Sequence, residues 1–140
     1  MKAVVDTNVI VSGVFFGGVP GRILAAWSIG QVALVLSPAI LAEYRRVGAE
    51  LGAQYPDLIA AWEPILALIT IHATIVDAPP LTERVGDDPA DEMFLAAALA
   101  AGTRVVVSGD KHLLRVSGWR GIMVCTPRQF LDEHLPPVDS

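Results

Sequence analysis

Short apolar runs alternate with segments of helical spacing along most of the chain. The runs are a few residues long and rich in valine and isoleucine, which is typical of strands buried on both faces of a parallel sheet. A further apolar stretch, residues 9–14, lies beyond Asp6, near which the first strand is expected to end. Five runs predict strands: residues 3–5, 32–36, 71–76, 104–107 and 122–125.

Helices are predicted between these strands by local start and stop signals. Ser37, Asp88 and Thr126 each precede a proline, and a polar N-cap followed by proline at the first helical position favours a helix start. The predicted stops are Gly30, Gly52 and Gly102. The predicted helices cover residues 20–29, 38–51, 56–69, 89–101 and 127–135, with a short helical turn at 113–114. Glycine and proline in residues 15–21, and acids and prolines in residues 77–87, predict two loops.

Buried strands that alternate with helices indicate an α/β protein. We therefore expect a three-layer α/β/α sandwich with a mostly parallel central sheet. A chain of 140 residues is long enough to bury a core as one domain. The predicted organisation is a single domain over residues 1–135, followed by a frayed tail over residues 136–140.

Charge and cysteine content narrow the functional classes. The net charge of −5 argues against a protein that holds nucleic acid by positive charge alone, although bound divalent cations would reverse the local sign. Cys125 is the only cysteine, so an intrachain disulfide and a thiolate metal cage are excluded. The sequence shows no apolar run of the roughly 18 residues that a membrane span needs, and no signal peptide. We expect a cytoplasmic protein without membrane association.

Four acids occur where a parallel sheet would bring them to one edge. Asp6 and Asp110 each follow a predicted strand, at the carboxyl end where such sheets bind ligands. Asp91 lies in the first turn of a predicted helix, and Glu43 lies about 40° beyond Val47, beside the apolar stripe of its helix. Clustered carboxylates suit Mg²⁺, which prefers oxygen ligands and can polarise a phosphoryl group and activate water.

Each of these acids also has a structural explanation. Asp6 and Asp110 can serve as turn or cap residues, Asp91 can favour the helix dipole, and Glu43 can be a solvated helix residue. Their occurrence in one ordered pattern favours a shared site.

That pattern resembles the PIN domain, whose VapC-like members are toxin ribonucleases. The resemblance is carried by Asp6-Thr-Asn, by Glu43, by Asp88-Pro-Ala-Asp91 before an alanine-rich helix, and by Ser108-Gly-Asp110. It covers roughly residues 1–131. It implies that Asp6, Glu43, Asp91 and Asp110 are catalytic residues that bind Mg²⁺ or Mn²⁺. The supporting polar residues that it implies are Asn8 and Ser108, and Asp88 has either a metal role or only its N-cap role.

The resemblance also implies partners. The expected substrate is RNA, cut to leave a 5′-phosphate and a 3′-hydroxyl, and the expected protein partners are a small antitoxin and a second copy of the chain. Lys111, Arg115 and Arg45 are candidate RNA contacts, which the family pattern does not specify.

Two other functions remain open at this stage. A phosphatase with an aspartyl nucleophile is disfavoured, because the similar phosphatases have a second aspartate two residues after the first, where this chain has Asn8. A non-catalytic RNA- or protein-binding domain of the same fold would be expected to lack one or more of the acids, and all four are present.

Overall fold

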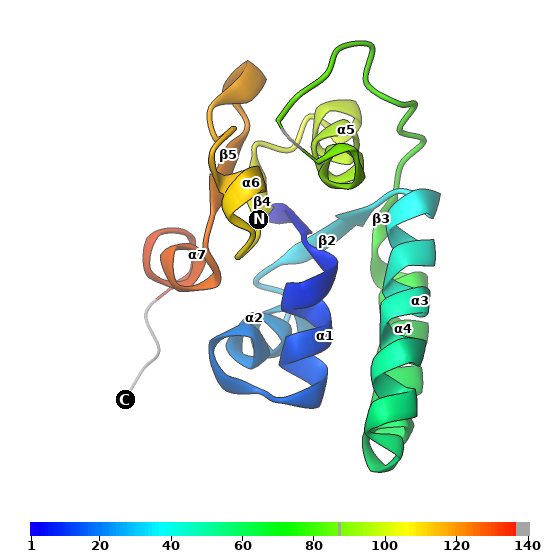
Figure 1. Cartoon of the computed structure of the whole chain (residues 1–140). Helices are drawn as coiled ribbons and strands as arrows, with labels where there is room; N and C mark the ends of the chain where they lie inside the picture. Colours follow the sequence, from blue (N-terminus) through cyan, green and yellow to red (C-terminus); the bar gives the residue numbers. More distant parts are fainter. Residues whose placement is uncertain (87, 137–140) are drawn as a thin grey trace.

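A computed structural model describes residues 1–86 and 88–136. Asp87, at the end of the predicted loop 77–87, and residues 137–140 of the predicted tail lie outside the described residues. Over the described part, one sheet contains five parallel strands in the order β3-β2-β1-β4-β5 (Figure 1). The strands are β1 (Lys2–Val5), β2 (Ala33–Leu36), β3 (Thr74–Ile75), β4 (Val105–Val107) and β5 (Met123–Cys125). This confirms the predicted α/β fold.

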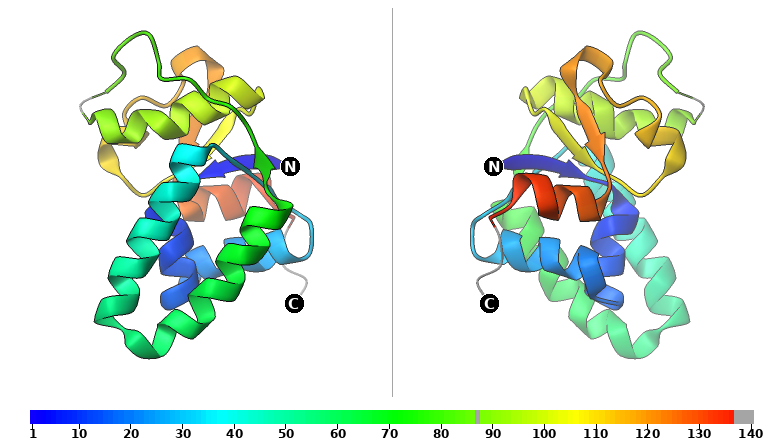
Figure 2. Two further views of the ribbon diagram at one scale, coloured as in Figure 1. Left: turned by 90° about the vertical axis from the view of Figure 1, so that its right-hand side faces the viewer. Right: turned by 90° about the vertical axis from the view of Figure 1, so that its left-hand side faces the viewer.

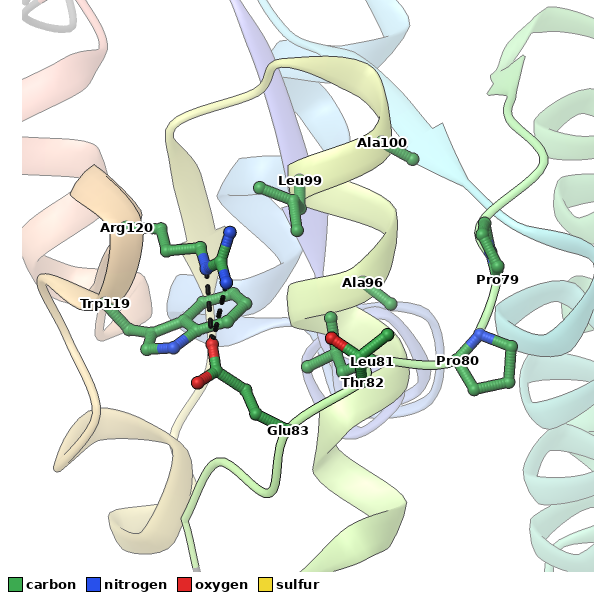
Figure 3. A pocket seen from close by; sticks show the side chains of 10 residues that line it. All are labelled: Pro79, Pro80, Leu81, Thr82, Glu83, Ala96, Leu99, Ala100, Trp119 and Arg120. Carbon is green, nitrogen blue, oxygen red and sulfur yellow. Dashed lines mark hydrogen bonds and ion pairs between the residues drawn. The ribbon is translucent and has the colours of Figure 1, made fainter.

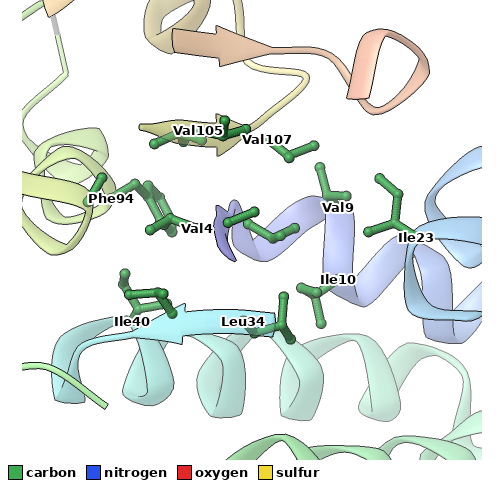
Figure 4. Packing of buried hydrophobic residues seen from close by; sticks show 14 of the residues in the cluster. Val4, Val9, Ile10, Ile23, Leu34, Ile40, Phe94, Val105 and Val107 are labelled. Atoms are coloured by element: carbon green, nitrogen blue, oxygen red, sulfur yellow. The ribbon is translucent and has the colours of Figure 1, made fainter. Parts of the chain in front are cut away.

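Helices cover both faces of this sheet. Figure 4 shows Phe94 of α5 on one side of the central strand β1, and Val9 and Ile10 of α1 with Ile23 of α2 on the other. All four side chains are buried, so the core lies on both faces of β1. The helices are α1 (Thr7–Phe15), α2 (Gly18–Ser28), α3 (Pro38–Gln54), α4 (Ile59–His72), α5 (Glu92–Ala101), α6 (Lys111–Leu114) and α7 (Pro127–His134). Short 3₁₀ turns are η1 (Pro56–Leu58), η2 (Pro89–Asp91) and η3 (Trp119–Gly121).

The predicted loop 15–21 is wrong, because two helices occupy this region and its preceding apolar stretch. α1 begins directly after Asp6, and only Phe16 and Gly17 separate it from α2. Gly17 has a φ of 72°, a conformation that glycine adopts without a steric penalty. Gly13 serves close helix packing, since a Cβ there would lie 2.9 Å from the carbonyl oxygen of Pro20. These glycines therefore mark a tight helix–helix corner.

Two other boundaries also differ from the prediction. α3 does not end at the predicted stop, Gly52, but continues to Gln54. Gly48 and Gly52 instead allow α4 to pack closely, since a Cβ on Gly48 would lie 2.2 Å from the Trp62 ring. α3 and α4 form an antiparallel pair that extends away from the sheet (Figure 2). The predicted strand 71–76 shortens to β3, because Ile71 and His72 complete α4 and only Thr74 and Ile75 pair with β2.

Three other predicted caps are confirmed. The Ser37 hydroxyl accepts a hydrogen bond from the Ile40 amide at 3.2 Å, and Thr126 forms a complete capping box with Gln129. Gly102 ends α5 with a φ of 66°. No single helix in residues 1–86 or 88–136 is both long and apolar enough to cross a membrane; α1 and α2 meet that test only as a pair bent by 94°.

Candidate active site

Asp6 is held at the carboxyl end of β1 by contacts to its backbone and both carboxylate oxygens. Its amide donates to the Val107 carbonyl at 2.8 Å, which joins it to β4. Its Oδ1 accepts from the Asn8 amide at 3.4 Å and thereby caps α1, and its Oδ2 accepts from the Ser108 hydroxyl at 2.6 Å. The residue is 6% exposed. The carboxylate therefore has a defined position at the sheet edge.

Ser108 links this carboxylate to the second acid at the same edge. Its hydroxyl group donates to the Asp6 carboxylate, and the hydroxyl oxygen accepts from the backbone amide of Asp110 at 3.0 Å. The Asp110 side chain in turn caps α6 by accepting from the His112 amide at 2.9 Å. Ser108, which was predicted as a supporting residue, therefore contacts both aspartates through one hydroxyl.

Asp91 approaches this pair from η2, at the start of α5. Burial is the main reason that the pKa of its carboxyl is raised to about 7. The charge of Asp110 and a hydrogen bond to it contribute to this increase, as do the charges of Asp88 and Asp6. Its Oδ2 is buried and has no hydrogen-bond partner among the described residues. A buried carboxylate oxygen without a hydrogen-bond partner is energetically unfavourable.

The Asp6 carboxyl experiences the same unfavourable environment. Burial raises its pKa, and the charge of Asp110 adds to the increase, while the hydrogen bonds from Ser108 and Asn8 oppose it. Asp6, Asp91 and Asp110 are therefore mutually coupled negative groups, here called the aspartate cluster. A divalent cation would relieve their repulsion.

Glu43, the fourth predicted acid, pairs with an arginine of its own helix. Its carboxylate binds the Arg46 guanidinium with contacts of 2.7 and 3.3 Å, and Arg46 also contacts Glu50 at 2.7 Å. Arg46 lies three residues after Glu43, a spacing that allows such pairs on one helix face. The spacing of Glu43 and Arg46 could therefore have predicted this ion pair, but the apolar stripe of the helix gives no information about it.

In their present positions, the acidic side chains of the described residues do not form a complete set of metal ligands. Within residues 1–86 and 88–136, no three His, Cys, Asp or Glu side chains are arranged to hold one ion. The donor chemistry nevertheless fits a hard cation, because the aspartate cluster supplies several carboxylate oxygens, and one of them is buried with no hydrogen-bond partner in residues 1–86 and 88–136. Binding of one ion would require side-chain movement.

A pocket of about 440 Å³ opens beside Asp6 and Asp110. Asn8 and Ser12 line it from α1, and Pro20 and other residues complete its walls. Asn8 is exposed, so its side-chain amide is accessible from this pocket. Lys111, Arg115 and Arg45 are exposed near the ends of α6 and on α3, and none of the three lines the pocket.

Asp88 and the loop before it fix the position of Asp91. The Asp88 side chain accepts from the Ala90 amide at 3.0 Å, which confirms its N-cap role. Glu92, whose role the sequence did not indicate, accepts from the amide of buried Val85 at 2.8 Å. These bonds join the loop to the start of α5.

The same loop is also tied to η3, at a second cavity of about 240 Å³. Figure 3 shows Glu83 of the loop contacting Arg120, whose guanidinium lies over the Trp119 ring. The Glu83–Arg120 distance is 3.0 Å. Arg120 adopts a φ of 49°, which is unusual for a residue with a side chain.

A comparison with known protein families identifies the family of this chain. The sequence model of the PIN domain matches residues 2–112, a range that includes the aspartate cluster and Glu43. No curated protein matches the sequence. The chain therefore belongs to the PIN-domain family, whose members are typically nucleases that use divalent metal ions.

Proposed function

We propose that this protein is an endoribonuclease that depends on Mg²⁺ or Mn²⁺. The observation that carries the proposal is the aspartate cluster, whose three carboxylates interact electrostatically and include a buried oxygen that has no hydrogen-bond partner among the described residues. The PIN-domain match supports it, because nuclease activity is typical of that family. Asp6, Asp91 and Asp110 would hold the ion, with Glu43 joining them after release from Arg46.

The residues have distinct roles in this proposal. A bound divalent cation would polarise the phosphoryl group and lower the pKa of an attacking water. Ser108 keeps Asp6 and Asp110 at a fixed separation. Asn8 lines the pocket wall and offers its side-chain amide to a phosphate oxygen. Attack by water on phosphorus breaks the bond to the 3′ oxygen, which leaves a 3′-hydroxyl and a 5′-phosphate.

Asp6→Asn tests the enzymatic proposal. Asparagine retains an oxygen that can accept from Asn8 or Ser108, but it removes the charge that a cation needs. We expect metal-dependent cleavage of a labelled single-stranded RNA to fall at least about 100-fold while the far-UV circular dichroism is unchanged. Asp57→Asn is the matched control, because Asp57 lies exposed in η1. Unchanged cleavage by Asp6→Asn, or equal wild-type activity in excess EDTA, would contradict the proposal.

We further propose that the enzyme is a cytoplasmic toxin held inactive by a small antitoxin. Induced expression should then arrest growth, and co-expression of a small protein encoded beside it should restore growth. The Asp6→Asn variant should be harmless. If the active nuclease can be overproduced without effect on growth, the toxin role is wrong and the nuclease role is unaffected.

Self-association as a homodimer is supported by exposed apolar side chains on the outer side of α4 and β3. Leu68, Ile71 and Ile75 are 46%, 72% and 46% exposed, which is high for residues of this type. Analytical ultracentrifugation at increasing concentration should detect a dimer, and Ile71→Lys should weaken it. A wild-type monomer throughout the concentration range would exclude this assembly.

The ion pair between Glu43 and Arg46 favours one alternative, a non-catalytic RNA-binding domain. In that case Glu43 would only form an ion pair on the surface of α3. RNA binding without cleavage in both Mg²⁺ and Mn²⁺ would support this alternative.

A further inference from the structure

Tyr44 is a buried polar residue of α3 that the predicted site does not include. Its side chain is 0% exposed, and its hydroxyl donates a hydrogen bond to the carbonyl oxygen of Val5. Val5 ends β1 and directly precedes Asp6. From sequence periodicity, Tyr44 belongs to the apolar stripe of its helix, and that pattern does not indicate where its hydroxyl binds.

The contact completes a clamp around the peptide group that carries Asp6. The carbonyl of this group belongs to Val5 and accepts from Tyr44, and its N–H belongs to Asp6 and donates to the Val107 carbonyl at 2.8 Å. Carbonyl and N–H point in opposite directions from a trans peptide group. The peptide is therefore held from α3 on one side and from β4 on the other.

Tyr44 also remains a donor under all ordinary conditions. Burial raises the pKa of its phenol well above the usual value, and the negative charge of Asp6 contributes to that increase. A buried hydroxyl with this partner has a defined orientation.

We propose that Tyr44 is a positioning residue of the metal site, which sets the place of Asp6 relative to α3 and thus to Glu43. This inference rests on the proposed function. Glu43 is the neighbour of Tyr44 on α3, so one side chain connects the strand that carries Asp6 with the helix that carries Glu43. The clamp acts through the backbone of Asp6 and touches neither substrate nor ion.

Tyr44→Phe removes the hydroxyl and keeps the ring in the core. Residues that orient metal ligands typically change metal affinity or activity by about 10- to 100-fold. We expect the Mn²⁺ concentration for half-maximal thermal stabilisation to rise about 10-fold, with a parallel shift in the Mn²⁺ dependence of RNA cleavage. The first titration needs no RNA and reports on the ion directly.

Thr103→Val is the matched control. It also removes one buried hydroxyl, from a side chain that has no hydrogen-bond partner among the described residues. Its Mn²⁺ midpoint should equal that of the wild type, even if its melting temperature changes.

The outcomes separate this inference from the proposed function. If Mn²⁺ does not stabilise the wild type, the proposed metal site itself is wrong. If Mn²⁺ stabilises the wild type and Tyr44→Phe at the same midpoint, the positioning role is wrong. Failure of Tyr44→Phe to fold, with Thr103→Val folded, would also overturn it, because the hydroxyl would then be a requirement of the fold.

Discussion

Asp91 and Glu43 are the two predicted metal ligands that come from helices, and their surroundings are opposite. Asp91 is partly buried beside Asp110, and one of its oxygens has no hydrogen-bond partner among the described residues. Glu43 is bound to an arginine of its own helix. Burial and the negative charge of Asp110 therefore disfavour the charged form of Asp91, whereas Glu43 is paired with a positive charge.

The two acids therefore differ in what their charges contribute to the stability of the folded protein, although both are predicted metal ligands. Asp91 is kept at a position where its charge is unfavourable, which is common for functional sites. Glu43 gains little from a pair with an exposed arginine, because such pairs contribute about 0–1 kcal/mol. A cation could therefore stabilise the first acid strongly and attract the second at small cost.

The largest effect is expected for Asp91→Asn. Cleavage should fall at least about 100-fold, because the substitution removes a charged ligand from the aspartate cluster. The metal-free protein should melt a few degrees higher, because a charge no longer has to be buried and the repulsion from Asp110 is removed. Cleavage assays and calorimetry in EDTA test the two parts.

Asp88→Asn provides the matched control for this prediction. Asparagine caps a helix as well as aspartate, so the bond to the Ala90 amide is retained. If Asp88 is only a cap, its variant should keep activity within about three-fold. A similar loss in both variants would make Asp88 a ligand, and a lower melting temperature of Asp91→Asn would contradict the repulsion.

Glu43→Gln should have a smaller effect on activity and almost none on stability. We expect cleavage to fall about 10- to 100-fold, because the fourth oxygen ligand loses its charge. The melting temperature should change by less than about 2 °C, since the lost ion pair is exposed. Glu50→Gln is the control, because Glu50 binds the same arginine from farther along α3. Equal cleavage by both variants would remove Glu43 from the site.

The features that sequence predicted well depend on neighbouring residues. Ser37, Asp88 and Thr126 bind amides two or three positions away, so their caps follow from local sequence. The proximity of Asp6 and Asp110 is also predictable, because carboxyl ends of parallel strands share one edge of the sheet.

The features that sequence did not predict depend on distant partners or on side-chain orientation. Glycine and proline in residues 15–21 predicted a loop, whereas α2 begins at Gly18 and packs closely against Gly13 of α1. The Tyr44 hydroxyl has its acceptor in another element, 39 residues away in sequence. Glu43 was placed correctly at the edge of the buried stripe, but helical periodicity does not determine whether its carboxylate binds Arg46 or an ion.

Acidic pH should stabilise the metal-free protein. The Asp91 carboxyl has a pKa of about 7 in the folded protein and an ordinary value of 3.8. Between these values the folded protein holds more protons, so its free energy of unfolding decreases as pH rises from about 4 to about 7 and is level above. Guanidinium unfolding in EDTA at pH 5 and pH 7.5 tests this slope. Asp91→Asn should reduce it, and an equal slope in both proteins would assign it to other groups.

The smallest effect is expected for Arg46→Met, which frees Glu43 without altering any acid. Because exposed ion pairs contribute about 0–1 kcal/mol, the Mn²⁺ midpoint of thermal stabilisation should decrease by no more than about five-fold. Arg45→Met removes the same charge from the neighbouring position of α3, so it controls for general attraction of the cation. A lower midpoint in Arg46→Met alone would show that Arg46 competes with the ion for Glu43. Equal midpoints in the two variants would mean that Glu43 does not exchange between arginine and metal.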